Sequence, residues 1–271
     1  MNKNNRIKAV LLGIIVIVTL LLIGCASDDD RAETKGWSVE QLYTAASEAL
    51  GSKNYTKAIK LYTTLEATYP YGVYAQQGML DLAYAYYQNA QPELALPTIA
   101  QFINTYPTNA NMDYALYLKG YINYKNDNGL LSRFTRQDLS ERDPQGVQEA
   151  YKAFKELVTK YPNSRFVPDA KDKINRLVNA LARGEIYRAR YYMGIKAYLA
   201  AITRTQDVIT NYANTPFVEE ALAMQEFAYD KLGQAQLSRQ TRQVLALNFP
   251  KSQYLVEEWK YQDMPWYQFW H

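Results

Sequence analysis

Side chains that commonly perform catalysis are scarce in this 271-residue chain, which has one cysteine, Cys25, and one histidine, His271. A single cysteine cannot form a disulfide within the chain, and these two residues are too few for a Cys/His zinc site. Adjacent acidic pairs such as Glu219 and Glu220 point about 100° apart on a helix, which is a poor geometry for two-carboxylate hydrolysis. We therefore expect no enzyme activity, no metal and no cofactor, and a murein hydrolase is the enzyme alternative.

Cys25 has the sequence context of a lipid attachment site. Residues 1–8 are polar and basic, residues 9–23 form an apolar run of 15 residues, and the run ends in Leu22-Ile23-Gly24-Cys25. The run is shorter than the about 18 residues of a spanning helix, and this order is typical of a secretory signal. The ending resembles the bacterial lipobox, which implies cleavage before Cys25 and covalent lipid on it. Because Ala26 rather than aspartate follows, we expect an outer-membrane anchor with the chain facing the periplasm.

The charge balance argues against a nucleic-acid partner. The signal peptide, residues 1–24, contains Lys3, Arg6 and Lys8 and no acid, so it accounts for the whole net charge of +3. Residues 25–271 then hold 27 basic (30 minus 3) and 27 acidic side chains, whereas nucleic-acid binders show a basic excess. Residues 25–36 lack apolar periodicity beyond Cys25 and are predicted to be a flexible tether.

A helix-pair repeat follows the tether. An aromatic residue followed by proline recurs at Tyr69, Tyr106, Tyr161 and Phe249, with a degenerate copy at Tyr212. The copies lie 37, 55, 51 and 37 residues apart, so two spacings exceed the period of 37 by 18 and 14. Twelve residues before the second member of each copy lies a small residue, namely Ala58, Ala95, Ala150, Ala201 and Ser238. One helix pair cannot bury its apolar face alone, so we expect the pairs to stack.

The second unit carries the pattern most completely. Met79, Leu82, Ala83 and Tyr86 lie at i, i+3, i+4 and i+7, which is one face of a helix. With Ala95, Phe102 and Pro107 in the partner helix, this order resembles the tetratricopeptide pattern. The resemblance implies an all-α superhelix, or α-solenoid, of about five helix pairs over residues 37–251. Pro97 inside the partner helix predicts a kink or a later start of that helix.

In tetratricopeptide repeats the first helix of each pair lines the inside of the superhelix. Transferring its inward positions predicts a tyrosine-rich wall in the first three units and a largely charged wall in the last two. The tyrosines predicted to bind a peptide are Tyr43, Tyr84, Tyr87, Tyr114, Tyr117, Tyr121 and Tyr124. Other inward positions are Gln77, Leu80, Gln88, Lys125, Arg183, Ile186, Arg190, Met193, Glu220, Ala223, Phe227, Asp230 and Lys231. Tyrosine suits varied peptides because its large ring loses little rotamer entropy, whereas Tyr62 and Tyr86 are interpreted as fillers between helices.

Two segments fall outside the repeat. The 18 extra residues of the third unit lie within residues 125–144, a polar stretch that predicts a long loop. The aromatic tail, residues 252–271, contains Trp259, Trp266 and Trp270. It either covers the open end of the last repeat or binds a partner or a membrane interface.

Short strings across the chain resemble the BamD family of outer-membrane assembly lipoproteins. They are Tyr-Pro-Tyr-Gly-Val-Tyr-Ala-Gln-Gln at 69–77, Asp-Tyr-Ala-Leu-Tyr-Leu-Lys-Gly at 113–120, Arg-Asp-Pro-Gln at 142–145 and Tyr-Pro-Asn-Ser at 161–164. The resemblance implies a non-catalytic scaffold that binds unfolded outer-membrane β-barrel precursors and a periplasmic POTRA domain of BamA, alongside other lipoproteins of the assembly machinery.

The same resemblance divides the solenoid into a substrate-binding half, about 37–165, and a partner-binding half, about 166–251. The string at 198–208 matches the family segment that faces BamA, and Arg204 matches its key arginine. Arg183 and Arg190 join it as predicted partner-binding residues. A pilotin-like or peptidoglycan-associated periplasmic repeat lipoprotein is the alternative, because it would share the lipobox and the repeats.

Overall fold

The computed structural model describes residues 34–125 and 144–260. Cys25, the signal peptide, most of the tether, residues 126–143 of the insertion and the end of the aromatic tail lie outside the described residues. Within the two described ranges, no helix combines the length and the apolar content needed to cross a membrane.

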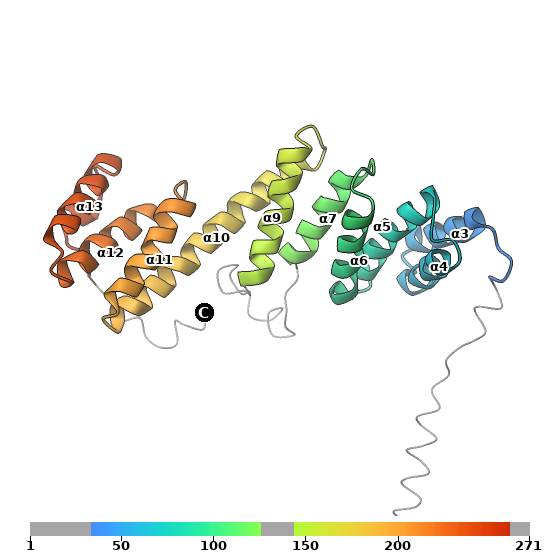
Figure 1. Ribbon diagram of the computed structural model, residues 1–271, viewed down its shortest axis with the longest axis horizontal. Helices are drawn as coiled ribbons and strands as arrows, with labels where there is room; N and C mark the ends of the chain where they lie inside the picture. Colours follow the sequence, from blue (N-terminus) through green and yellow to red (C-terminus); the bar gives the residue numbers. More distant parts are fainter. Residues whose placement is uncertain (1–33, 126–143, 261–271) are drawn as a thin grey trace, which may run out of the picture.

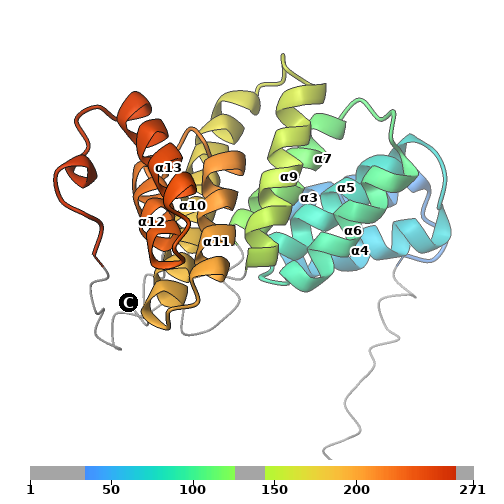
Figure 2. The same ribbon diagram turned by 60° about the vertical axis from the view of Figure 1, so that its left-hand side comes forward.

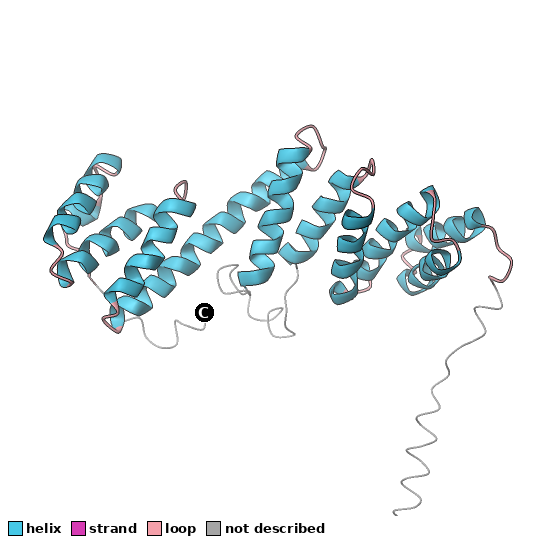
Figure 3. Ribbon diagram, viewed as in Figure 1, coloured by secondary structure: helices cyan, strands magenta, loops and turns pink. Residues whose placement is uncertain are grey.

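The described residues form five antiparallel helix pairs, which confirms the predicted all-α repeat architecture (Figure 3). Figure 1 shows the pairs stacked in a row from α3 to α13, so that the chain forms an elongated solenoid. The pairs are α3 (Val39–Gly51) with α4 (Tyr55–Thr68), α5 (Val73–Gln88) with α6 (Pro92–Thr105), α7 (Met112–Lys125) with α9 (Pro144–Lys160), α10 (Val167–Gly194) with α11 (Tyr198–Asn211), and α12 (Val218–Lys231) with α13 (Ala235–Asn248). A short 3₁₀ turn, η2 (Gln253–Leu255), follows.

The aromatic residues of the repeat end the second helix of each pair. Tyr69, Tyr106 and Phe249 are the C-caps of α4, α6 and α13, with φ of −131°, −125° and −132°. A residue before proline is forced out of the helical region, so the dipeptide stops each helix. Tyr212 ends α11 with φ of −128° although Ala213 follows, and the repeat therefore keeps this geometry without proline.

Small residues allow the two helices of a pair to approach closely. Ala58, Ala95, Ala150 and Ala201 are fully buried, as predicted, whereas Ser238 in the last pair is partly exposed. A Cβ placed on Gly120 of α7 would lie 2.7 Å from the ring of Phe154 in α9. Real Cβ atoms do not approach that closely, so only glycine fits between these two helices.

Pro97 does not delay α6, and the prediction of a later start is wrong. The helix begins at Pro92 and continues through Pro97 to Thr105. Proline removes the N–H that would bond the carbonyl of Glu93. Glu93 and Pro97 both lie on the exposed side of α6, so water can hydrate this carbonyl.

The core consists of three clusters along the solenoid, and the boundary between two of them falls inside one helix. Leu42 to Ala85 form the first cluster, and the central cluster runs from Met79 to Leu177. The third begins at Ala182 and reaches Trp259. The 28-residue α10, twice the length of α11, absorbs the 14 extra residues of the fourth unit. The cores therefore change within α10 rather than at residues 165–166.

Candidate functional site

The seven predicted tyrosines lie on the first helices of the first three pairs, and we call them the tyrosine surface. Tyr43 is on α3, Tyr84 and Tyr87 are on α5, and the other four are on α7. All seven are half-buried and pack against the core clusters with one side of the ring. Tyr62, interpreted as a filler, is 1% exposed.

Asp81 on α5 organises the N-terminal end of the tyrosine surface. Its Oδ2 accepts hydrogen bonds from the hydroxyls of Tyr43 (3.1 Å) and Tyr62 (3.4 Å), and its Oδ1 accepts one from Nε2 of Gln77 (2.9 Å). Burial raises the pKa of Asp81, although the three hydrogen bonds act in the opposite direction. Burial, followed by the charge of Asp81, also raises the pKa of Tyr43 to about 12. The hydroxyl of Tyr43 therefore remains a neutral donor at physiological pH.

A stack of rings forms the other end of the tyrosine surface. The ring of Tyr117 is stacked on Tyr121 (5.8 Å between centroids) and on Phe166 (4.7 Å), and Tyr87 meets Tyr121 edge-on at 6.0 Å. Phe166 precedes α10, so the stack joins three helix pairs. Each ring supports its neighbour, so the ring contacts run without a break from α5 through α7 to the start of α10.

An ion pair at the start of α10 adjoins this stack. Nζ of Lys173 lies 2.6 Å from Oδ1 of Asp169, and the hydroxyl of Tyr117 donates to Oδ2 at 2.7 Å. Although burial alone would raise the pKa of Asp169, hydrogen bonds from Lys173 and Tyr117 leave it lowered. The ammonium group of Lys173 also lies 5.5 Å from the ring centroids of both Tyr121 and Tyr124. The tyrosine surface is therefore bordered by a fixed ion pair whose ammonium group also contacts two of its rings.

Sequence reasoning missed Asp81, Phe166, Asp169 and Lys173. Asp81 lies four residues after Gln77 and three before Tyr84, both predicted to point inward, so helical periodicity alone could have identified it. The i, i+4 spacing of Asp169 and Lys173 indicated an ion pair. Nothing in the sequence linked that pair to α7.

Several predicted wall positions belong to the core instead. Leu80, Ile186, Met193 and Ala223 are 0%, 1%, 4% and 3% exposed, so the prediction that they line the inner surface is wrong. Conversely, Tyr187 and Tyr191 on α10 are 40% and 51% exposed. The fourth unit therefore presents aromatic rings as well as charges.

The three predicted partner-binding arginines occupy different surroundings. Arg190 forks onto Glu220, with Nε–Oε1 and Nη2–Oε2 distances of 2.8 and 2.7 Å. The guanidinium group of Arg183 lies 5.7 Å from the ring centroid of Phe217. Both arginines are on α10, the first helix of their pair, and the structure does not bring them together with Arg204.

Arg204 lies on α11, the second helix of the pair. Its Nη1 is 3.5 Å from Glu185 Oε2 and 4.0 Å from Asp207 Oδ2, and its side chain is 36% exposed. Glu185 is shared with Arg188. The buried Nε of Arg204 has no acceptor among the described residues. Arg204 is therefore partly exposed, with hydrogen-bonding capacity that the described chain leaves unused.

The described part of the tail packs along the last repeat rather than over its open end. Trp259 is 6% exposed, and its ring meets Phe227 of α12 at 5.5 Å between centroids. Leu247 and Val244 on α13, at the end of the stack, are 82% and 42% exposed. The prediction that the tail covers the open end is therefore wrong for residues 252–260, while residues 261–271 lie outside the described residues.

Stacked helix pairs with a half-buried aromatic surface define a tetratricopeptide-type helical-repeat protein. Among residues 34–125 and 144–260, no three His, Cys, Asp or Glu side chains gather as metal ligands would. The family model described as outer membrane lipoprotein YfiO matches residues 36–245. The chain belongs to this family.

Relatives with the name outer membrane protein assembly factor BamD match nearly the whole chain. The protein from Neisseria meningitidis serogroup A is 46% identical over 260 residues, covering 94% of this chain and 97% of the relative. The protein from Xylella fastidiosa strain Temecula1 is 36% identical, covering 90% of this chain and 84% of its own length. A crystal structure of kinesin light chain TPR-like repeats is 14% identical and covers 79% of this chain and 97% of its own. Its TM-score of 0.34 is too low to bear on the fold.

Proposed function

We propose that this chain is a non-catalytic scaffold for assembling β-barrel proteins in the outer membrane, and that its tyrosine surface binds the unfolded precursors. Family membership and the shared name of the relatives support the general role. The tyrosine surface is the observation that carries the proposal for precursor binding, because its rings offer one face to the core and one to a ligand.

The chemistry of the tyrosine surface suits an unfolded membrane-protein chain. Phenol rings bind apolar side chains without requiring one fixed sequence, and their hydroxyls can pair with exposed backbone groups. Lys173, which is paired with Asp169, lies against the rings of Tyr121 and Tyr124. A chain with aromatic residues therefore finds complementary rings on this surface.

The C-terminal repeats hold BamA in this proposal, through a POTRA domain and with Arg204 as a contact. Arg204 supports this role because it is partly exposed and retains a buried N–H without an acceptor among the described residues. A carboxylate on BamA can accept from this guanidinium group. Lipid on Cys25 anchors the scaffold to the outer membrane from the periplasmic side, where other assembly lipoproteins can bind it.

Replacing Tyr84, Tyr87 and Tyr121 with alanine tests precursor binding. We expect the affinity for a peptide with the aromatic C-terminal sequence of a β-barrel protein to fall at least about tenfold, because buried aromatic contacts dominate such binding. Fluorescence anisotropy of the labelled peptide measures it. Tyr71→Ala is the matched control, since Tyr71 is 88% exposed and lies outside the tyrosine surface. Unchanged affinity in the triple variant would show that precursors bind elsewhere.

Charge reversal at Arg204 tests partner binding. We expect Arg204→Glu to reduce co-purification of BamA from detergent-solubilised outer membranes at least about tenfold, because a carboxylate on the partner would meet a like charge. Arg239→Glu, on an exposed position of α13, is the control. Peptide binding should stay at the wild-type level in both variants. Equal recovery of BamA with both variants would remove Arg204 from the interface.

A further inference from the structure

The chain after α13 folds back along the last helix pair, and we call residues 249–260 the C-terminal strap (Figure 2). The hydroxyl of Ser252 accepts a hydrogen bond from the backbone N–H of Tyr254 at 3.2 Å. Nη2 of Arg242 donates to the carbonyl of Leu255 at 2.7 Å, while Nη1 lies 2.9 Å from Glu226. Only residues 253–255 of the strap are helical, so most of it crosses the repeat as irregular chain.

Trp259 is the most deeply buried large side chain of the strap and packs on α12, while Tyr254 and Leu255 lie half-buried against the same core cluster. Trp259 is 6% exposed, whereas Val256 is 88% exposed and the neighbouring Glu257, Glu258 and Lys260 are also exposed. Deep burial of one aromatic residue among exposed neighbours is typical of a bound peptide anchored in a pocket.

The surroundings of Trp259 form a defined site for an aromatic ring. Phe227 meets the indole edge-on at 5.5 Å, and Tyr198 meets Phe227 from behind at 6.5 Å. The indole N–H points to Oε1 of Glu220 at 3.5 Å. Arg190 holds Glu220 in place through its two-pronged contact. A ring that also carries an N–H or O–H donor, as in tryptophan or tyrosine, fits this arrangement.

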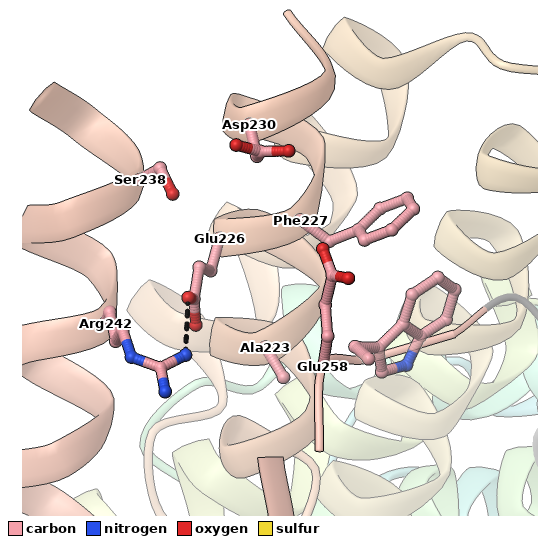
Figure 4. A pocket seen from close by; sticks show the side chains of 8 residues that line it. Ala223, Glu226, Phe227, Asp230, Ser238, Arg242 and Glu258 are labelled. Atoms are coloured by element: carbon pink, nitrogen blue, oxygen red, sulfur yellow. Dashed lines mark hydrogen bonds and ion pairs between the residues drawn. The ribbon is translucent and has the colours of Figure 1, made fainter. Parts of the chain in front are cut away.

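The site has space beside it. A pocket of about 210 Å³ adjoins Trp259 and lies between the strap, α12 and α13. Figure 4 shows Phe227 and Glu258 on one side of this pocket and the Arg242–Glu226 pair on the other. The indole therefore lies at the margin of a pocket, where a residue next to a bound aromatic side chain can be accommodated.

We propose that Phe227, Tyr198 and Glu220 form a second aromatic-binding site on this solenoid, which Trp259 occupies in cis and which a tryptophan or tyrosine of an unfolded precursor takes when the strap lifts. The inference rests on the proposed function, because it assigns the same class of ligand to a second place. Trp259 itself supplies the argument for the ligand, since it is an aromatic residue of a non-helical chain bound on this solenoid.

Competition between the strap and a precursor follows from this arrangement. While Trp259 is seated, a precursor has only the tyrosine surface, whose nearest helix, α7, lies two helix pairs before α12 along the solenoid. The effective concentration of Trp259 at the site is high because the strap belongs to the same chain as the site. The precursor must therefore bind the tyrosine surface first. Once it is bound there, a second aromatic residue of the same precursor reaches the site of Trp259 at a similarly high effective concentration.

Peptide stoichiometry in full-length variants tests the second site. We expect Trp259→Ala to bind a second molecule of a tyrosine-containing β-barrel peptide, measured by isothermal titration calorimetry, and to bind it more tightly than Trp259→Phe, in which the strap still competes for the site. Adding Phe227→Ala to Trp259→Ala should abolish the second site alone. Combining Trp259→Ala with the triple alanine change in the tyrosine surface should abolish the first site alone.

These variants separate the inference from the proposed function. Loss of both peptides when the triple change is combined with Trp259→Ala, or a second peptide that survives the addition of Phe227→Ala to Trp259→Ala, would overturn the second site. One peptide in Trp259→Ala would also overturn it. Binding that is unaffected by the tyrosine substitutions would instead contradict the proposed function.

Displacement in the unsubstituted protein gives an independent measurement that needs no core substitution. With 5-fluorotryptophan incorporated, the ¹⁹F resonance of Trp259 is assigned by its absence in Trp259→Phe. We expect saturating peptide to move this resonance to the position of a solvent-exposed indole. A resonance that keeps its buried position at saturation would show that the strap is a permanent part of the core.

Discussion

Asp81 has an environment that its residue type does not suggest. A carboxylate is normally solvated, yet Asp81 lies half-buried beneath the tyrosine surface and accepts three hydrogen bonds. Loss of water raises its pKa above the usual range. The hydroxyls of Tyr43 and Tyr62 are thereby fixed toward the carboxylate, and their rings are oriented for the surface above.

Asp81→Asn tests this environment through the pH dependence of stability. Because the folded pKa of Asp81 is raised, the folded chain binds a proton more readily than the unfolded chain. The stabilising contribution is therefore complete at low pH and is lost as the pH rises from about 4 through the raised pKa. We expect the stability of Asp81→Asn relative to wild type to improve between about pH 4 and pH 7, as measured by urea unfolding.

An offset that is equal at both pH values would contradict the raised pKa. A part of the offset that does not change with pH is expected from the hydrogen bond with Gln77, because an asparagine amide cannot accept at both positions; only the pH-dependent part reports on the raised pKa. Tyr43→Phe is the control, since it removes one donor to Asp81 but keeps the carboxylate.

At the residue scale, the sequence predicted which tyrosines lie on the first helices, but it did not predict the hydrogen bonds that their hydroxyls make. Helical periodicity relates residues within one element. Tyr43 and Tyr62 reach Asp81 across 38 and 19 residues, and Tyr117 reaches Asp169 across 52. Contacts over such separations depend on how the pairs stack. The same reason explains why Leu80 and Ile186 were assigned to the surface although neighbouring pairs bury them.

At the scale of the elements, most of the fold was predictable. The aromatic–proline spacing located the ends of the second helices, and the small residues located the contacts within four of the five pairs. The insertion of 14 residues could not be assigned from spacing, because a loop and a longer helix add the same number. The structure places these residues in α10. In this helix Leu177 belongs to the central core cluster and Ala182 to the third.

Gly120 gives a prediction at this scale. Gly120→Ala places a methyl group 2.7 Å from the ring of Phe154, so α7 and α9 must separate. We expect a loss of about 1–3 kcal/mol in the free energy of unfolding, measured by chemical denaturation. Gly146→Ala in α9 is the matched control, because its new methyl would meet nothing within 4 Å and alanine favours a helix. Equal stability of the two variants would mean that the helices are not in close contact.

At the scale of the whole molecule, the balance of 27 basic and 27 acidic side chains in residues 25–271 bears on how ligands bind. Charge steering is weak without an excess of one sign. Binding to a surface of phenol rings is also insensitive to screening, unlike contacts between exposed charges. Precursor binding and partner binding should therefore respond differently to salt.

Salt titration measures this difference. Raising NaCl from about 0.05 M to about 0.5 M should leave peptide affinity for the tyrosine surface within about twofold, since ring contacts dominate there. BamA binding, with Arg204 in the interface, should weaken several-fold over the same range. A steep salt dependence of peptide binding would indicate that Lys173 and Asp169, rather than the rings, control the affinity.

The length of α10 has a mechanical consequence. At about 1.5 Å per residue its 28 residues make a rod of roughly 42 Å, and its two ends are embedded in separate cores. A long helix without a kink bends only gently, so α10 limits how far the two cores can move relative to each other. In the proposed function, a precursor on the N-terminal repeats is therefore held at a restricted distance from a partner on the C-terminal repeats.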